Sequence, residues 1–126
     1  MGCPLLDQMP SRSYDRGQTH VVEVDITDDM RGPSGAVHGG LIASLVDRAG
    51  AFAAHRASGC SVATSSVALN YLAAAEAGPL QASATMLRSG RRQGVVEVRV
   101  HDAGSGGVLV ATALLTLSYR AEGGRP

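Results

Sequence analysis

The spacing of hydrophobic residues changes twice along this chain, and each change predicts a different kind of element. Residues 20–26 alternate between apolar and polar side chains, which predicts a half-exposed strand with one apolar face: Val22, Val24 and Ile26. Residues 27–36 are rich in glycine, proline and aspartate, so we expect a loop there. Residues 1–18 show no regular spacing, and we predict an irregular N-terminal segment.

A helical pattern begins at His38 and continues to about Arg56. Apolar side chains recur at every third or fourth position, and together they cover most of the circumference: Leu41, Ile42, Leu45, Val46, Ala49, Phe52 and Ala53. Gly59 follows the last turn and is typical of a helix end. A helix with so little polar surface must be covered on most sides, which a small protein can achieve by curling a sheet around it.

Alternation returns after the helix in four segments that are separated by glycine-containing turns. The segments are residues 61–72, 80–88, 95–101 and 108–119. In the first, strict alternation separates two faces, one with Ser65, Val67, Leu69 and Tyr71 and the other with Thr64, Ser66, Ala68 and Asn70. Because no helix separates these strands, we predict the α+β class: one antiparallel sheet wrapped around a single long helix, in one domain over residues 1–126.

Composition and charge exclude several classes of protein. The 11 basic and 11 acidic residues cancel, Trp is absent and only 3% of residues are aromatic, so we expect no nucleic acid and no membrane as a partner. The longest apolar stretch is interrupted by Asp47 and Arg48, and no signal peptide pattern is seen, so we expect a cytoplasmic protein. Cys3 and Cys60 are far apart, and no cluster of residues has metal-ligand spacing, so we expect no metal.

The most informative chemistry lies in residues 37–47, where an aspartate stands two turns into the apolar helix. Asp47 is the only acidic residue between Asp29 and Glu76. Its neighbours three and four positions away include no cation and are all small: Ala43, Ser44, Gly50 and Ala51. An unpaired carboxylate is costly to bury, so a fold retains it most readily at a cleft or a ligand. Asp47 is therefore a candidate catalytic residue; the alternative is a carboxylate that caps backbone or arginine groups at a subunit contact.

Two glycines open the helix and give it a candidate anion-binding end. The first turn of a helix has amide groups without an intrahelical acceptor, and it lies at the positive end of the helix dipole. At Gly39 and Gly40 no side chain blocks the approach of a carbonyl oxygen to these amides. The alternative is that the glycine pair only lets the helix pack closely on the sheet. His38, in the same turn, is either a general acid or a side chain that binds the local backbone.

These residues resemble a known family over nearly the whole of residues 19–120. The order of strand, loop, His-Gly-Gly, helix with an acid, and four strands is similar to the hotdog fold. Within that fold it is similar to the PaaI-like acyl-CoA thioesterases of the phenylacetate-pathway type. The resemblance rests on the segment Gly35-Ala36-Val37-His38-Gly39-Gly40 and on Asp47 eight residues after Gly39. Weaker matches are Asn70-Tyr71 and the Gly90-Arg91 turn.

The resemblance implies a role for each matching residue. The Gly39 amide polarises the thioester carbonyl, Asp47 is the general base or the nucleophile, and Thr64 helps to hold the water or the carboxylate. It also implies a homodimer, or a homotetramer built as a dimer of dimers, with the site at the subunit interface. Coenzyme A then enters only as part of the substrate, and no cofactor is needed. Many members have asparagine six residues before the histidine, directed at the acyl group or the water, where this chain has Gly32.

Two further features are compatible with an acyl-CoA substrate. Arg88, Arg91 and Arg92 gather at one predicted hairpin. Arginine pairs with phosphate in a forked geometry, so this turn is a candidate site for the phosphates of coenzyme A, with a solvated turn as the alternative. Ala51 and the other small residues beside Asp47 leave room for an acyl group.

Two other functions stay open on the sequence. Hotdog dehydratases and hydratases of acyl thioesters use a histidine and an acid that usually stand closer together on the helix, whereas His38 and Asp47 are nine residues apart. The alternative from a different class is a protein that binds acyl-CoA or an aromatic ligand with little turnover, which Gly32 favours. A serine nucleophile is not favoured, because the G-x-S-x-G pattern is absent.

Overall fold

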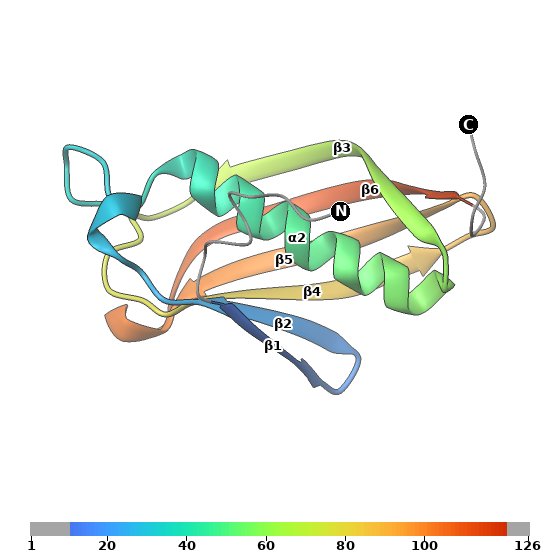
Figure 1. Cartoon of the computed structure of the whole chain (residues 1–126), viewed down its shortest axis with the longest axis horizontal. Helices are drawn as coiled ribbons and strands as arrows, with labels where there is room; N and C mark the ends of the chain where they lie inside the picture. Colours follow the sequence, from blue (N-terminus) through green and yellow to red (C-terminus); the bar gives the residue numbers. More distant parts are fainter. Residues whose placement is uncertain (1–10, 121–126) are drawn as a thin grey trace.

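Six strands of residues 11–120, the part of the chain that the computed structural model describes, form one antiparallel sheet that wraps around one long helix (Figure 1). The sheet order is β1-β2-β4-β5-β6-β3. The strands are β1 (Ser11–Arg16), β2 (Thr19–Val24), β3 (Ser61–Tyr71), β4 (Leu80–Ser89), β5 (Gln93–Asp102) and β6 (Val108–Arg120). The helix is α2 (Gly39–Ser58), and two short 3-10 turns complete the elements, η1 (Asp28–Met30) and η2 (Ala103–Ser105). The predicted α+β class and the central helix are confirmed.

Helix α2 begins after the N-cap residue His38 and ends at a glycine in the left-handed conformation. His38 is its N-cap residue, and Gly59 closes it in the left-handed conformation (φ 70°), donating its N–H to the carbonyl oxygen of His55 at 2.8 Å. At Gly50 a Cβ would lie 2.9 Å from Leu115, so the helix approaches the sheet more closely there than an alanine would permit. The buried face contains Ile42, Leu45, Val46, Ala49, Gly50, Ala53 and Ala54.

Phe52, one of the apolar residues of the predicted helical pattern, is 40% exposed. It lies on the flank of α2, where its ring meets His20 edge-on at 5.6 Å and the Arg48 guanidinium lies over it at 5.6 Å. The sheet covers one side of α2, so the expectation that the helix is covered on most sides is not met at the flank that carries Phe52.

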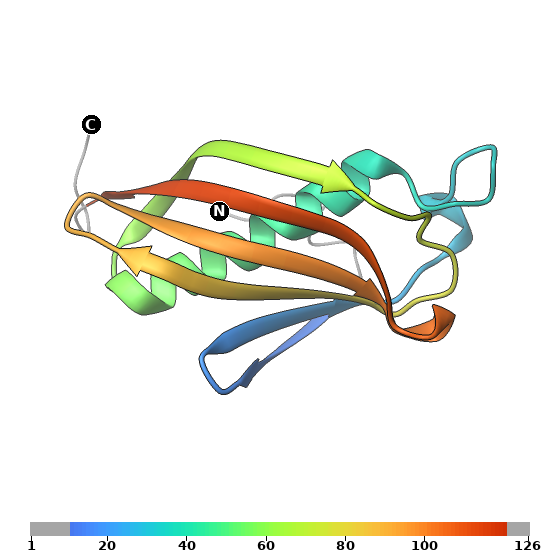
Figure 2. The same cartoon turned by 180° about the vertical axis from the view of Figure 1, so that it is seen from behind.

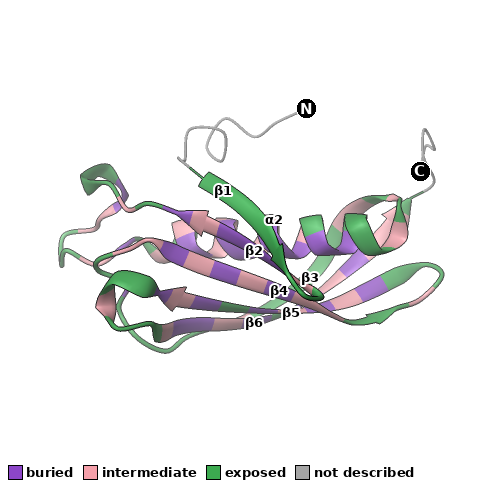
Figure 3. Cartoon of the chain, turned by 90° about the horizontal axis from the view of Figure 1, so that it is seen from below, coloured by how far each residue is buried: buried purple, intermediate pink, exposed green. Residues whose placement is uncertain are grey.

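Strands β4, β5 and β6 provide most of the sheet side of the core. Buried and less buried residues alternate along them, as Figure 3 shows in purple and pink. The predicted strands are confirmed, each with ends within about two residues of the observed ones. The central valines and leucines are fully buried: Leu80, Val96, Val98, Val100, Leu115 and Leu117. The buried residues of α2 pack against this face of the sheet.

A bulge in β3 changes which side chains share a face. Thr64 pairs with Leu117, and Val67 pairs with Leu115, both of which point to the helix, so the pairing is shifted by one residue between Thr64 and Ser66. The extra residue, Ser65, is bonded through its hydroxyl to that of Ser118 at 2.6 Å. Strict alternation had placed Thr64 on the face opposite Val67, and this part of the prediction is wrong. The bulge turns Thr64 toward α2.

The N-terminal segment is less irregular than predicted. Residues 11–16 form β1, which pairs with β2 from Ser11↔Val24 to Arg16↔Thr19. All six residues of β1 are exposed and none gives an apolar alternation, so the sequence carried no strand signal. Backbone pairing holds β1 to β2, and polar side-chain contacts add to it, including the bond from the Tyr14 hydroxyl to Glu23 at 2.6 Å. Residues 1–10 and 121–126 lie outside the described residues.

Strand β3 forms one edge of the sheet, opposite the edge formed by β1, as the view from behind shows (Figure 2). Within residues 11–120 it pairs only with β6, and its other edge has no partner. Most of its residues are exposed, among them Val67 and Tyr71. An edge strand of 11 residues with exposed apolar side chains is a ready template for pairing with another strand.

Candidate active site

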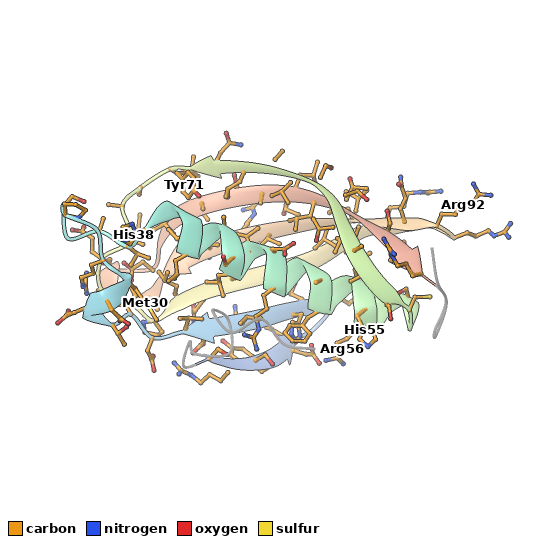
Figure 4. The ribbon with its side chains drawn as sticks, turned by 45° about the horizontal axis from the view of Figure 1, so that its top comes forward. Met30, His38, His55, Arg56, Tyr71 and Arg92 are labelled. Carbon is orange, nitrogen blue, oxygen red and sulfur yellow. The ribbon has the colours of Figure 1, made fainter. Side chains whose placement is uncertain are left out.

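The loop before α2 is folded back on itself, and this fixes where the helix begins. The N–H of Gly32 donates to the carbonyl of Ala36 at 2.8 Å, and the N–H of Gly35, with a positive φ of 89°, donates to Gly32 at 3.0 Å. The N–H of His38 then donates to the carbonyl of Met30 at 3.0 Å. Figure 4 shows Met30 and His38 at the same end of the molecule. The segment that leads into α2 is therefore held by backbone bonds.

The amides of Gly39 and Gly40 have no acceptor within the helix, because they belong to its first turn. The carbonyl of the N-cap residue His38 accepts the N–H of Leu41 at 3.1 Å and that of Ile42 at 3.3 Å. The hydrogen bonds of the helix therefore begin with the amide of Leu41, after those of Gly39 and Gly40. The His38 side chain is exposed and makes no capping bond, so the predicted alternative in which it binds the local backbone finds no support as a cap. Two unpaired N–H groups at the positive end of a 20-residue helix form an anion-binding position.

The two glycines differ in what surrounds them. A Cβ at Gly39 would lie 3.2 Å from the Tyr71 ring, so close packing against β3 accounts for this glycine. A Cβ at Gly40 would meet nothing within 4 Å, so packing within the chain does not account for the second one. The alternative of a glycine pair required only for packing therefore explains one of the two residues. The space in front of Gly40 is open.

Asp47 is half-buried in the middle of α2 and accepts a hydrogen bond from Thr64. The Thr64 hydroxyl lies 2.6 Å from Oδ1 of Asp47, across the gap between α2 and the bulged part of β3. The sequence offers Asp47 no salt-bridge partner on its own helix, and the Thr64 hydroxyl from β3 provides a hydrogen-bond donor instead. Ala51 follows Asp47 by about one turn and is also half-buried. A carboxylate that is oriented by one hydroxyl and remains partly accessible can take up a proton or attack a carbon atom.

The structure does not bring Gly39 and Asp47 of one chain together. They are eight residues apart on a continuous helix, which at 1.5 Å per residue separates them by about 12 Å along the axis. Groups that act on the same carbonyl must lie within about 3–3.5 Å of the reacting atoms. The chain therefore presents two half-sites, one formed by Gly39, Gly40 and Tyr71, and the other by Asp47 and Thr64.

The remaining predicted site residues lie in different places. Gly32 is next to His38, since a Cβ at Gly32 would lie 3.3 Å from Cε1 of the His38 ring. Arg88, Arg91 and Arg92 are exposed at the β4–β5 hairpin, and Figure 4 shows Arg92 at the end of the molecule opposite His38. This hairpin cannot contact a group bound at the helix start of the same chain.

Sequence reasoning missed Asp102, which is fully buried at the end of β5. Its carboxylate accepts N–H bonds of 2.7 to 3.0 Å from three consecutive residues: Glu76, Ala77 and Gly78. Burial raises the pKa of Asp102, but these donors and the Ser105 hydroxyl outweigh it and hold the pKa below its usual value. No local pattern could have revealed this role, because the partners lie about 25 residues away in the chain.

A second polar cluster lies on the other flank of α2. The Asp15 carboxylate bonds Nδ1 of His20 at 3.0 Å and also contacts Arg56, which Figure 4 labels near the end of the helix. The hydrogen bond from His20 and the Arg56 cation hold the pKa of Asp15 below its usual value. A cavity of about 310 Å³ opens beside this cluster. Arg56 is nine residues after Asp47, about half a turn around the helix, so this cavity is separate from the Asp47 half-site.

Residues 11–120 contain no group of three or more His, Cys, Asp or Glu side chains that could hold a metal ion. Cys60 is a free thiol, and Cys3 lies outside the described residues. No helix in the same part of the chain is both long and apolar enough to span a membrane.

The sequence matches one protein family over most of this structure. Residues 34–121, from the loop before α2 to the end of β6, match the model of the thioesterase superfamily. The protein therefore belongs to the thioesterase superfamily, whose general chemistry is the hydrolysis of thioesters. No functionally curated protein sequence matches the chain significantly.

Solved structures with the same arrangement of elements support the PaaI-like type. A phenylacetic acid degradation-related protein of Ralstonia eutropha JMP134 has a TM-score of 0.82 and 25% identity, over 94% of this chain and 92% of its own. The PaaI protein of the E. coli phenylacetic acid degradation operon has a TM-score of 0.84 and 21% identity, over 93% and 84%. A thioesterase of Haemophilus influenzae has a TM-score of 0.84 and 21% identity, over 93% and 82%. The chain has the hotdog fold of these proteins.

Proposed function

We propose that this protein hydrolyses acyl-CoA thioesters to the free acid and coenzyme A. The observation that carries the proposal is the pair of half-sites on one helix: open amides at its N-terminus and the Asp47 carboxylate bonded to Thr64 in its middle. Thioester hydrolysis needs a donor for the oxyanion and a group that activates water or attacks the carbonyl. The chain offers one half-site for each requirement.

In the reaction, the thioester oxygen lies at the helix start, where the Gly39 amide and the helix dipole stabilise the negative charge that develops on it. In the first route, Asp47 takes a proton from water while the water oxygen bonds to the carbonyl carbon, and the C–S bond then breaks to release the thiolate of coenzyme A. In the second, the Asp47 carboxylate attacks the carbonyl, the thiolate leaves, and water hydrolyses the mixed anhydride. The Thr64 hydroxyl orients the carboxylate in both routes.

The two half-sites act on one substrate only if two chains contribute to it. Gly39 and Asp47 of one chain are about 12 Å apart along α2, too far for a single carbonyl. In a two-fold dimer that pairs its β3 edges in antiparallel fashion, the two helices also run in opposite directions. If the two-fold axis passes near Ala43, midway between Gly39 and Asp47, the helix start of one chain faces Asp47 of the partner subunit.

The same dimer brings the arginine hairpin of one subunit near the helix start of the other subunit. Within one chain, Arg92 and His38 are at opposite ends, as Figure 4 shows. An antiparallel dimer brings the hairpin of one subunit to the end where the other subunit's helix begins. Arg88, Arg91 and Arg92 are exposed and can pair with the phosphates of coenzyme A from there. This arrangement favours a CoA thioester over a simple thioester as the substrate.

The test is release of free thiol from a panel of acyl-CoA substrates, from short aliphatic to aryl-acetyl chains. We expect turnover by the wild type and its loss in Asp47→Asn, with the fold retained. Asp25→Asn is the matched control, because Asp25 is exposed and bonded only to Arg12 among the described residues. If Asp47→Asn keeps more than about a tenth of the wild-type kcat, corresponding to less than about 1.4 kcal/mol of barrier, Asp47 is neither base nor nucleophile. Single turnover in ¹⁸O-water tests the nucleophilic route: a first acid product without label establishes it, with water attack at Cγ of Asp47, because the general-base route always puts one water oxygen into the acid.

One observation favours a second candidate, a protein that binds acyl-CoA or an aromatic ligand with little turnover. Gly32 leaves the His38 ring without the neighbouring amide side chain that the resemblance leads one to expect at this position. Tight binding of coenzyme A or a non-hydrolysable analogue by calorimetry, without thiol release on any substrate, would support this candidate. A dehydratase or hydratase is disfavoured by the sequence, because His38 and Asp47 stand nine residues apart, further than the histidine and the acid of the hotdog dehydratases usually do.

A further inference from the structure

Tyr71 lies next to the helix start and has no part in the reaction described so far. Its hydroxyl donates a 2.6 Å hydrogen bond to the carbonyl oxygen of Gly39, the first residue of α2. The two residues are 32 positions apart, and Figure 4 shows Tyr71 and His38 at the same end of the molecule. The bond joins the last residue of β3 to the first turn of the helix.

Each open amide at the helix start belongs to a peptide group whose carbonyl is held by another donor. The N–H of Gly39 shares its peptide with the carbonyl of His38, which accepts two amides of the next turn at 3.1 and 3.3 Å. The N–H of Gly40 shares its peptide with the carbonyl of Gly39, which accepts the Tyr71 hydroxyl. A hydrogen bond to a peptide carbonyl polarises the whole amide group, so each N–H becomes a better donor.

The surroundings of the two glycines fit this arrangement. The Tyr71 ring packs directly on Gly39, where a Cβ would lie 3.2 Å from it, so the ring fixes the position of that residue. The space next to Gly40 is empty, since a Cβ there would meet nothing within 4 Å. Gly40 is exposed and its amide belongs to the first turn, so a group that approaches the end of the helix can reach the N–H of Gly40 as well as that of Gly39.

We propose that Tyr71 is the positioning residue of a two-amide oxyanion site, in which the N–H groups of Gly39 and Gly40 both face the thioester oxygen. The proposal rests on the function proposed above, because it requires a thioester carbonyl at this end of the helix. Tyr71 acts through the peptide between Gly39 and Gly40, which it orients and polarises, and it does not touch the substrate. The polarised amide stabilises the thioester oxygen more strongly as negative charge develops on it, so the Tyr71 hydroxyl lowers the energy of the transition state more than that of the bound substrate.

The first test is Tyr71→Phe, which removes the hydroxyl and keeps the ring against Gly39. We expect kcat to fall about three- to thirtyfold while KM stays within about twofold, because a weakened and less ordered oxyanion donor acts mainly on the transition state. Tyr14→Phe is the matched control. It removes a hydroxyl that also forms a 2.6 Å bond, to Glu23 on the β1–β2 pair, and leaves kcat unchanged.

The second test asks whether Tyr71 acts through the Gly40 amide. Gly40→Pro deletes this N–H at a first-turn position where no helical bond is lost, and Gly40→Ala keeps the N–H and adds a Cβ in open space. Removal of one oxyanion donor typically lowers kcat about 10²–10³-fold, so we expect Gly40→Pro to be far slower than Gly40→Ala. In the Gly40→Pro protein, Tyr71→Phe should have little further effect, because no Gly40 N–H is left to polarise.

Thermal midpoints of all variants show whether the fold is intact. If Gly40→Pro does not fold, the result for Tyr71→Phe decides the proposal alone. A Tyr71→Phe kcat within about twofold of wild type, or a rise in KM that accounts for the whole loss, overturns the proposal. Equal effects of Tyr71→Phe in the Gly40→Ala and Gly40→Pro proteins also overturn it, because the hydroxyl would then act by a route other than the Gly40 amide. Absence of thiol release by the wild type is a different result, which overturns the proposed function itself and the two-amide site with it.

Discussion

Replacement of Asp102 by asparagine should destabilise the protein and loosen its candidate active site. The carboxylate is fully buried and holds three consecutive amides of the β3–β4 loop. The residue before them, Ala75, accepts an N–H bond from Val37 at 2.9 Å. Val37 stands two residues before Gly39, so Asp102 is connected through the loop to the segment that starts α2.

The size of the effect follows from the bonds that asparagine cannot make. One oxygen of Asp102 accepts two of the amides and the other accepts the third, whereas asparagine has one oxygen and an NH₂ group that would face a backbone N–H. A hydrogen bond to a charged group contributes about 1.5–3 kcal/mol, and a buried donor without an acceptor costs about 1–3 kcal/mol. We expect the free energy of unfolding to fall by about 2–4 kcal/mol, which lowers Tm by about 8–16 °C in a domain of this size.

The difference between wild type and Asp102→Asn should depend on pH in a defined direction. Burial raises the pKa of Asp102, but its backbone donors outweigh burial, so the pKa in the folded state lies below the ordinary value of 3.8. A lowered pKa stabilises the fold above the unfolded-state value, and this stabilisation is lost as the pH falls through the folded-state value. The Tm difference should therefore be constant between about pH 5 and 8 and become smaller below about pH 4.

Differential scanning calorimetry of both proteins over this pH range is the assay, with Asp25→Asn as a control for loss of an exposed carboxylate. The control should change the free energy of unfolding by less than about 0.5 kcal/mol. A loss below about 1 kcal/mol for Asp102→Asn at pH 7, or a Tm difference that does not shrink in acid, would refute the assigned role of this carboxylate.

Four further predictions concern the candidate site. Thr64→Val should lower kcat about ten- to a hundredfold in the thiol-release assay, because a bond of about 1.5–3 kcal/mol to the Asp47 carboxylate is lost, and Thr64→Ser should restore most of it. Replacement of Arg91 and Arg92 by alanine should raise KM for CoA thioesters more than it lowers kcat, and less so in high salt; equal KM values at low salt would assign the turn to solubility. Gly32→Asn should raise kcat, because it supplies the amide side chain that the resemblance implies at this position. The backbone tolerates asparagine there, since φ is not positive and only the His38 ring must move. A folded variant with unchanged or lower rates would mean that the site works without that amide. Light scattering should show at least a dimer, and a stable monomer at micromolar concentration would contradict the shared site.

Most of the fold could be predicted because its elements are stabilised by local patterns. The helical spacing after His38 and the alternation in β4, β5 and β6 each bury an apolar face, and a shift of one residue would expose that face. Strand β1 could not be predicted this way, because all its side chains are exposed and it is held by backbone pairing with β2. The Ser65 bulge could not be predicted either, since it exists only relative to the pairing with β6.

The same distinction between local patterns and long-range contacts applies to the chemistry of the site. The sequence alone determined that an acid stands eight residues after a glycine at a helix start, because a helix has a fixed rise and turn per residue. It could not show that Thr64 faces Asp47 or that Tyr71 bonds Gly39, since each partner lies on β3 and its direction depends on the bulge and on strand pairing. Asp102 is the extreme case, because three of its donors are backbone amides about 25 residues away, and these carry no sequence signal.

The sequence by itself thus determined the helix, the alternating strands and the spacing of the candidate catalytic groups, all of which arise from interactions between residues close in the chain. The tertiary structure alone decided which strand supplies the hydroxyl next to each of those groups. The physical reason is that long-range contacts depend on strand register and on the packing of α2 against the sheet, which are properties of the whole fold and not of any segment.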